Sequence, residues 1–151
     1  MPGKATAADA DLLLKLYDLR RESELRKARN WMVVTFWPQS ADEIMKISAN
    51  FGSQENNWWR QVSGYWSMAA SLVEHGALNA DLFLEPPSSG EMYLIFAKMK
   101  PFLSELRQKL SPTMFLTIEN VINSTEKSRA HLQRTEANVA NRLKAMAEAA
   151  R

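Results

Sequence analysis

SQENNWWRQVSGYWSMAASLVEHG, residues 53 to 76, carries the strongest apolar pattern in the sequence. Apolar side chains recur at alternating intervals of four and three residues, which places them on one face of a helix. A second apolar line beside the first makes this face broad, so neighbours must cover the helix on more than one side. The two lines are Trp58, Val62, Tyr65, Ala69 and Leu72, then Trp59, Trp66 and Val73, with Met68 widening the face. Because Ser53 suits an N-cap and Gly76 a helix end, the pattern predicts a central buried helix over about residues 54–75.

A line of small residues, Gly64, Ser67 and Ser71, runs along the same predicted helix. Glycine inside a helix costs roughly 1 kcal/mol relative to alanine, so Gly64 needs a reason to be there. We expect it to permit a close crossing with another helix. The alternative is a gap in which a ligand lies against the backbone.

Length and composition predict one soluble globular domain. The chain has 151 residues, 46% of them hydrophobic, which is enough for a core of its own. The net charge of +2 is too small for the clustered basic face of a nucleic-acid-binding protein. The absence of cysteine excludes disulfides and thiolate metal sites and fits a reducing compartment. No signal-peptide pattern occurs at the start, so we expect a cytoplasmic protein.

The chain before the central stretch predicts two helices. The first is expected from about residue 7 to Phe36, since Pro38 ends it. Its charged middle is typical of a solvated helical face, because basic and acidic residues alternate there. A basic binding patch is the alternative, built from Arg20, Arg21, Arg26, Lys27 and Arg29. Ser40 and Glu43 form a capping box, which opens a short helix with Phe51 on its apolar face.

After the central stretch, Asn79 can cap a single turn. Residues 86–90, PPSSG, have the composition of a surface loop. Ser88 and Glu91 form a second capping box, which opens the next helix. Pro101 then kinks that helix or starts a new one.

Ser111 and Pro112 are a helix-start signal for a last helix that runs almost to the C-terminus. Its apolar face thins after residue 122, and such a helix commonly projects from the body, where it must pair or fray. Pairing with a second copy or another protein is one expectation. A frayed tail and packing along the first helix are the alternatives.

Together these patterns predict an all-α helical bundle of about five to six helices. Residues 1–151 are expected to form one domain, with a compact body over about residues 7–122. The polar helix over about residues 123–151 is its extension.

The sequence lacks the residue spacings of known metal-binding, phosphate-binding and catalytic motifs. Neither histidine belongs to a Glu-x-x-His or HExxH pattern, and no phosphate-binding glycine loop or nucleophile motif occurs. We therefore predict no metal, no cofactor and no catalytic residue. His75 is explained by a favourable interaction with the helix end, and an acid–base pair with Glu74 or Asp81 is the alternative. His131 is expected to be solvated.

The aromatic residues of the central helix could also line an apolar pocket beside Gly64. Core packing is the other explanation for them. The tentative ligand pocket consists of Trp58, Arg60, Gly64, Tyr65, Trp66, Glu74 and His75.

Residues 26–37, RKARNWMVVTFW, join basic to aromatic side chains, as membrane-surface helices do. Their apolar part is far shorter than the ~20 residues of a membrane-spanning helix. We expect this segment to be buried under the central helix instead.

Four segments carry a resemblance: Leu16-Tyr17-x-Leu19-Arg20-Arg21-Glu22, Phe36-Trp37-Pro38, Tyr65-Trp66-x-Met68-Ala69-Ala70-Ser71-Leu72-Val73-x-His75-Gly76 and Lys100-Pro101-Phe102-Leu103. On these segments the chain resembles an uncharacterised group of small bacterial proteins, over roughly residues 12–110. The resemblance implies a compact all-helical domain and no particular activity or substrate.

Three functional hypotheses follow. The first is a non-catalytic interaction protein that self-associates or binds a protein partner through its C-terminal helix. The alternative is a small-molecule-binding protein or enzyme with an apolar aromatic pocket near Gly64, Trp58 and Trp66. The third is membrane-surface association through residues 26–37.

Overall fold

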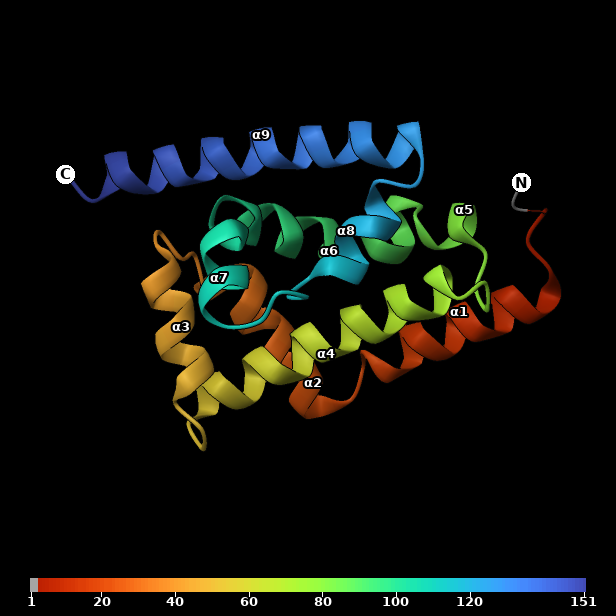
Figure 1. The fold of residues 1–151 in the computed structure, drawn as a ribbon, viewed down its shortest axis with the longest axis horizontal. Coiled ribbons are helices and arrows are strands. Elements are labelled where there is room, and N and C mark those ends of the chain that lie inside the picture. Colours follow the sequence, from red (N-terminus) through yellow and green to blue (C-terminus); the bar gives the residue numbers. More distant parts are fainter. Residues whose placement is uncertain (1–2) are drawn as a thin grey trace.

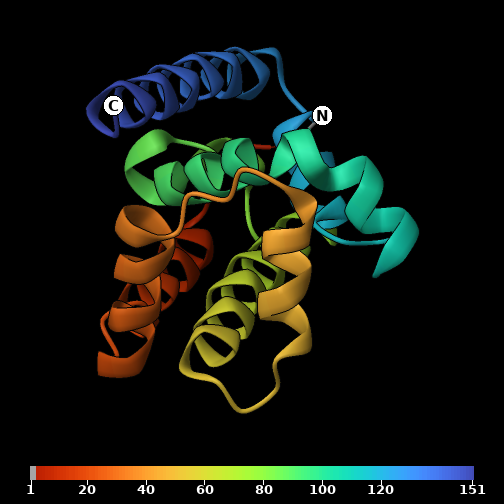
Figure 2. The same ribbon diagram turned by 90° about the vertical axis from the view of Figure 1, so that its left-hand side faces the viewer.

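The computed structural model describes residues 3–151, and these residues form helices in layers (Figures 1 and 2). One layer holds the first four helices, α6 lies over it with α7 and α8 beside it, and α9 lies across α6 on the outside. The described residues contain no β-strand, which confirms the all-α fold. The helices are α1 Ala7–Leu19, α2 Ser23–Asn30, the π-helix η1 Trp31–Thr35, α3 Ala41–Ala49, α4 Gln54–Glu74, α5 Ala80–Phe83, α6 Pro86–Met99, the 3₁₀-helix η2 Lys100–Phe102, α7 Leu103–Lys109, α8 Leu116–Ile122 and α9 Glu126–Ala149.

The central helix is α4, and it has the predicted bounds and caps. The Ser53 hydroxyl accepts a hydrogen bond from the Asn56 N–H at 3.1 Å. Gly76 has a φ of 76°, which glycine adopts without a side-chain clash. The Ala77 N–H then donates to the Leu72 carbonyl at 2.8 Å, so the helix end is closed as a left-handed glycine permits.

The buried face of α4 is rotated slightly from the predicted one. Trp59 is buried and Trp58 is only half-buried, while Met68 is 47% exposed. On this rotated face, Trp59 meets the ring of Phe115, the N-cap of α8, and Trp66 meets Phe83 of α5.

The predicted first helix, residues 7–36, is wrong as one element, because the chain turns between α1 and α2. The Glu22 carboxylate accepts from the Leu25 N–H at 2.9 Å and so starts a new helix at that point. Two arginines of α2 satisfy the carbonyls at the end of α1. Arg29 Nη1 donates to the Arg20 carbonyl at 3.2 Å, and Arg26 Nη2 donates to the Arg21 carbonyl at 2.6 Å.

The turn around α3 also differs from expectation. The Ser40 hydroxyl accepts from the Glu43 N–H as predicted, but the Glu43 carboxylate accepts from the Gln39 N–H instead of the Ser40 N–H. Phe51 is 77% exposed, so its predicted burial is wrong. The helix ends at Ala49, two residues earlier, and Phe51 lies in the turn that follows.

The predicted last helix is two helices, α8 and α9, separated by a turn that Thr125 ends as the N-cap of α9. Pro112 lies in a turn before α8, so the predicted start of a helix at Ser111 and Pro112 is wrong. The C-terminal helix packs on the body mainly along α6 (Figure 1), so the alternatives of a frayed tail and of packing along the first helix are wrong. Leu132 and Val139 of α9 are buried, and Lys100 pairs with Glu136 at 2.7 Å.

Gly64 lies on the exposed side of α4, and the expected helix crossing is wrong. A methyl group placed on its Cα would meet no neighbouring atom within 4 Å. Helix formation at this position is therefore weakened by a glycine that no contact requires.

Gly64→Ala is expected to raise the free energy of unfolding by about 0.5–1 kcal/mol, since alanine is the better helix former and there is space for its methyl group. Urea unfolding followed by circular dichroism measures the difference. Gly76→Ala is the matched control and is expected to destabilise the protein, because φ at that position is positive. Destabilisation by Gly64→Ala would contradict the open environment seen here.

Candidate functional site

The aromatic residues of the tentative pocket do not gather in one place. Tyr65 and Trp66 are buried in the core, whereas Trp58 is half-buried near the start of α4. Trp58 lies 6.1 Å from the Trp31 ring, and Gly64 faces open space. These side chains mainly serve packing between helices.

The polar residues of the tentative pocket are also separated. Arg60 donates to the Asn56 side chain at 3.0 Å near the start of α4. Glu74 is exposed at the other end of the helix, where it accepts from Asn120 at 2.9 Å. His75 is exposed as the C-cap, and its ring forms no hydrogen bond with any residue in 3–151. The structure therefore brings together no acid–base pair at this end.

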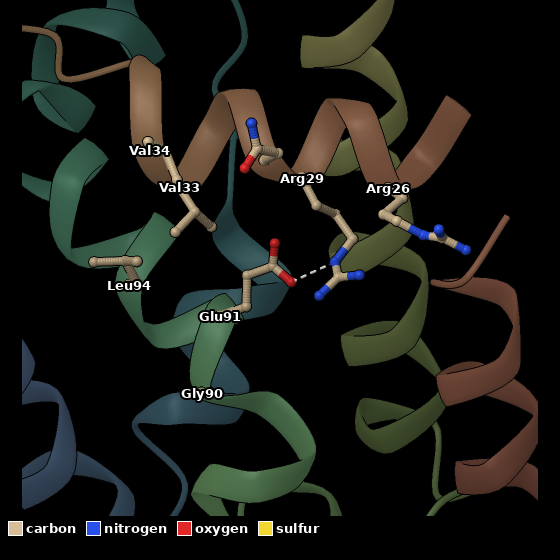
Figure 3. A pocket seen from close by; sticks show the side chains of 8 residues that line it. Arg26, Arg29, Val33, Val34, Gly90, Glu91 and Leu94 are labelled. Atoms are coloured by element: carbon tan, nitrogen blue, oxygen red, sulfur yellow. Dashed lines mark hydrogen bonds and ion pairs between the residues drawn. The ribbon is translucent and has the colours of Figure 1, made fainter. Parts of the chain in front are cut away.

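A pocket lies elsewhere, between α2–η1 on one side and α6 on the other (Figure 3). Its volume is about 450 Å³, within the range of small-molecule sites. One wall is apolar and the opposite end carries charged side chains, as Figure 3 shows. The lining residues are Arg26, Arg29, Asn30, Val33, Val34, Gly90, Glu91 and Leu94.

Glu91 is the central group of this pocket, and its position follows from the way α6 begins. Pro86 and Pro87 start the helix instead of ending a turn, which suits proline at the first helical positions. The backbone kinks at Ser89, where φ is −138°, and Ser88 makes no side-chain cap. The predicted loop over residues 86–90 and the second capping box are therefore both wrong. Glu91 is free to face α2.

The two oxygens of the Glu91 carboxylate have different environments. Its side chain is only 9% exposed, and Oε2 accepts from Arg29 Nε at 2.7 Å. Oε1 is covered from solvent and has no hydrogen-bond partner within the described chain. In Figure 3 this oxygen points into the space between the two helices, away from Arg29. A buried carboxylate oxygen without a donor is unfavourable, so a donor arriving in the pocket would be stabilised there.

Tyr65 lies close to these charges and helps to fix the turn between α1 and α2. Its hydroxyl donates to the Leu16 carbonyl. Burial raises the pKa of Tyr65 to about 12, against the opposing effect of the positive charges of Arg20 and Arg29. The hydroxyl therefore stays protonated and acts as a donor, which holds α1 against α4.

Lys98 is a second buried charge, on the next turns of α6. It is 3% exposed, its Nζ donates to the Met32 carbonyl of η1, and Nζ lies 4.1 Å from the centroid of the Trp37 ring. No carboxylate in residues 3–151 pairs with it. Burial lowers the pKa of Lys98 to about 7. These contacts join the π-helix to α6 beside the pocket.

A further pocket of about 400 Å³ lies between α6 and the first turns of α9. His131 is half-buried there instead of solvated, and its ring meets the Tyr93 ring edge-on at 4.5 Å. Burial, together with the charge of Arg134, lowers the pKa of His131. The Tyr93 hydroxyl already donates to the Leu84 carbonyl, so it is not free to act on a ligand.

Residues 3–151 contain neither a cluster of metal ligands nor a helix that could span a membrane. No three metal-ligating side chains gather anywhere in residues 3–151. Among those residues, no helix has both the length and the apolar character that crossing a membrane requires.

Sequence reasoning missed Glu91 and Lys98 as site residues. Glu91 has the spacing of a capping box, and Arg29 was expected on a solvated face, with a basic binding patch as the alternative. Lys98 offered a signal, because it follows Leu94 and Ile95 at helical spacing inside the apolar run LIFAKM.

The chain belongs to the family described as Domain of unknown function (DUF4760), whose model matches residues 5–125. This confirms the predicted membership of an uncharacterised group, over a longer part of the chain than the motifs covered. The bacterial origin of that group stays a prediction. No curated protein and no solved structure gives a significant match.

Proposed function

We propose that this member of a family without assigned function is a non-catalytic binding protein for a small zwitterion with an apolar body. The ligand is held in the pocket between α2 and α6. The observation that carries the proposal is the Glu91 carboxylate, whose Oε2 is paired with Arg29 while Oε1 has no donor within residues 3–151.

Charge favours a zwitterion over a simple cation. Two guanidinium groups, Arg26 and Arg29, accompany one carboxylate, so the pocket has a local excess of positive charge. An ammonium group on the ligand would donate to Glu91 Oε1 after a small movement of the side chains that cover this oxygen from solvent. A carboxylate on the same ligand would face Arg26, which is exposed at the pocket edge.

The wall of the pocket favours an apolar body between the two charges. Val33 and Val34 of η1 face Leu94 of α6, and Figure 3 shows these side chains grouped at one end. A ligand that covers them would remove apolar surface from water, and Val34 is 59% exposed without it.

The lining residues support binding in preference to catalysis. They are arginine, asparagine, valine, glycine, glutamate and leucine, and they include no nucleophile with an adjacent base. A pocket of this composition can orient a molecule but offers little to transform it.

A thermal-shift and calorimetric panel tests the proposal. We expect L-phenylalanine or L-leucine to stabilise the protein, since a ligand at 100 times its Kd adds about 2.7 kcal/mol to the free energy of unfolding. 3-Phenylpropionate lacks the ammonium group and 2-phenylethylamine lacks the carboxylate, so both should bind more weakly.

Glu91→Gln is expected to weaken the affinity for the zwitterion at least tenfold. Glu148 is an exposed glutamate of α9, and the control variant Glu148→Gln should bind the ligand as the wild type does. No stabilisation by either amino acid, or equal binding by Glu91→Gln, would refute the proposed site.

Self-association, or a protein partner on the C-terminal helix, stays a prediction. What supports it is the end of α9, where only Met146 of the residues after Leu143 is partly covered. Membrane-surface association through residues 26–37 also stays a prediction. Against it, Trp31 is buried and stacks on Phe36 at 4.7 Å, which leaves Val34 as the exposed large apolar side chain of that segment. Native mass spectrometry reports subunit number and retained ligand together.

A further inference from the structure

Arg20 is a buried cation without an anionic partner. It is 8% exposed, at the end of α1, and was expected to belong to a solvated face. Its guanidinium carbon lies 4.9 Å from the centroid of the Tyr17 ring and 5.4 Å from that of Trp66. Within the described chain, the Arg20 side chain takes part in no hydrogen bond and no ion pair.

The guanidinium borders a cavity of about 160 Å³ between α1, α4 and the start of α6. Apart from Arg20, its walls are mostly apolar: Leu13, Leu14, Phe83, Pro87 and the two aromatic rings that hold the guanidinium. The Tyr65 hydroxyl also lines it but is already bonded to the Leu16 carbonyl. Ser88 adds a neutral hydroxyl to the lining, and Arg20 is the charged group among the lining residues.

The chemistry of the guanidinium defines what would fit there. Arginine keeps its charge at all ordinary pH values and presents five N–H donors, which aromatic faces attract but do not satisfy as hydrogen-bond acceptors. A carboxylate matches the guanidinium with two parallel hydrogen bonds. Cation–π contacts with the Tyr17 and Trp66 rings hold the guanidinium in place before any ligand arrives.

The size of the cavity defines the rest of the ligand. An apolar protein cavity of about 150 Å³ accepts benzene. The space beside Arg20 is of that size and is open toward the exposed Leu14 and Tyr17, so it suits one ring or a short aliphatic chain.

We propose that Arg20, held between Tyr17 and Trp66, is the anchor of a second binding site, specific for small monocarboxylates with a benzene-sized apolar body. This site is separate from the pocket at Glu91, is carried by different residues and does not depend on the proposed function.

Benzoate is the probe, titrated into the full-length protein by calorimetry with tryptophan fluorescence in parallel, because Trp66 lines the site. We expect saturable binding of one benzoate and a change in fluorescence. Benzamide has the same shape without the charge and should bind at least tenfold more weakly. This comparison uses the wild-type protein, so it holds even where a variant fails to fold.

Arg20→Gln is expected to weaken the affinity for benzoate at least tenfold. Arg20→Lys should weaken it less, since lysine keeps the charge but cannot form the bidentate pair of hydrogen bonds. Arg21→Gln, an exposed neighbour, is the matched control and should bind as the wild type does. Glu91→Gln should also keep benzoate binding, which separates this result from the test of the other pocket. Absence of saturable binding, equal affinity for benzamide, or unchanged binding by a folded Arg20→Gln variant would overturn the proposal.

Discussion

Wild-type stability is expected to rise between about pH 7 and pH 10, and replacing Lys98 by methionine is expected to abolish most of that rise. Lys98 is 3% exposed, and its ammonium group has only the Met32 carbonyl and the Trp37 ring as partners. Burial lowers the pKa of Lys98 from 10.5 to about 7 in the folded protein. Between these values the unfolded chain holds a proton that the folded chain lacks.

The sign of the effect follows from proton linkage. Stability rises with pH wherever the unfolded state binds more protons, so the contribution of Lys98 is complete above pH 10.5 and is lost as the pH falls through 7. Each pKa unit corresponds to 1.36 kcal/mol, and the part of the rise between pH 7 and about pH 9.5 is on the order of 3 kcal/mol.

Urea unfolding of wild type and Lys98→Met at pH 6.5 and at about pH 9.5 measures this difference. Lys46→Met, an exposed lysine of α3, is the control and should keep the wild-type pH dependence. If Lys98→Met gains stability with pH as steeply as the wild type, another group is responsible and Lys98 is not neutral in the folded state.

Arg29→Met is expected to destabilise the protein by about 2–3 kcal/mol at pH 7. The substitution removes the one cation that, within residues 3–151, pairs with a carboxylate whose side chain is 9% exposed. Breaking such a buried pair from one side costs several kcal/mol. Because the Arg29 side chain is 28% exposed, the expected loss of stability lies at the lower end of the range for buried ion pairs. The Arg20 carbonyl also loses its donor.

A double-mutant cycle with Glu91→Gln isolates the pair. The second substitution should restore about half of the loss, because it removes the unpaired charge. Arg26→Met is the matched control on the same helix and in the same pocket, and it should change stability by less than about 1 kcal/mol, since Arg26 is exposed. Equal effects of Arg29→Met and Arg26→Met would mean that the buried pair contributes nothing.

The parts of the fold that depend on local signals were predictable from sequence. Ser53, Gly76 and the apolar stripe between them define α4, because caps and helical periodicity act over a few residues. Pro101 likewise introduces η2 and separates α6 from α7. All-helical architecture follows from such signals alone.

The candidate sites were not predictable, because they depend on contacts between distant segments. Ser88 and Glu91 have the spacing of a capping box, yet the helix has already begun at Pro86, and Arg29 from 62 positions earlier takes the carboxylate. Arg20 belongs to a charged segment whose pattern predicts a solvated helical face. Only the turn between α1 and α2 directs its side chain into the core.

The position of α9 has a consequence for synthesis of the protein. α6 is buried almost throughout between the first layer and α9, and the residues of α9 that complete this burial follow α6 in the chain. Until residues 126–149 have left the ribosome, the outer face of α6, including Tyr93, remains exposed to solvent. Burial of this face of α6 therefore waits for residues 126–149, so this part of the fold is completed later than the layer formed by the first four helices.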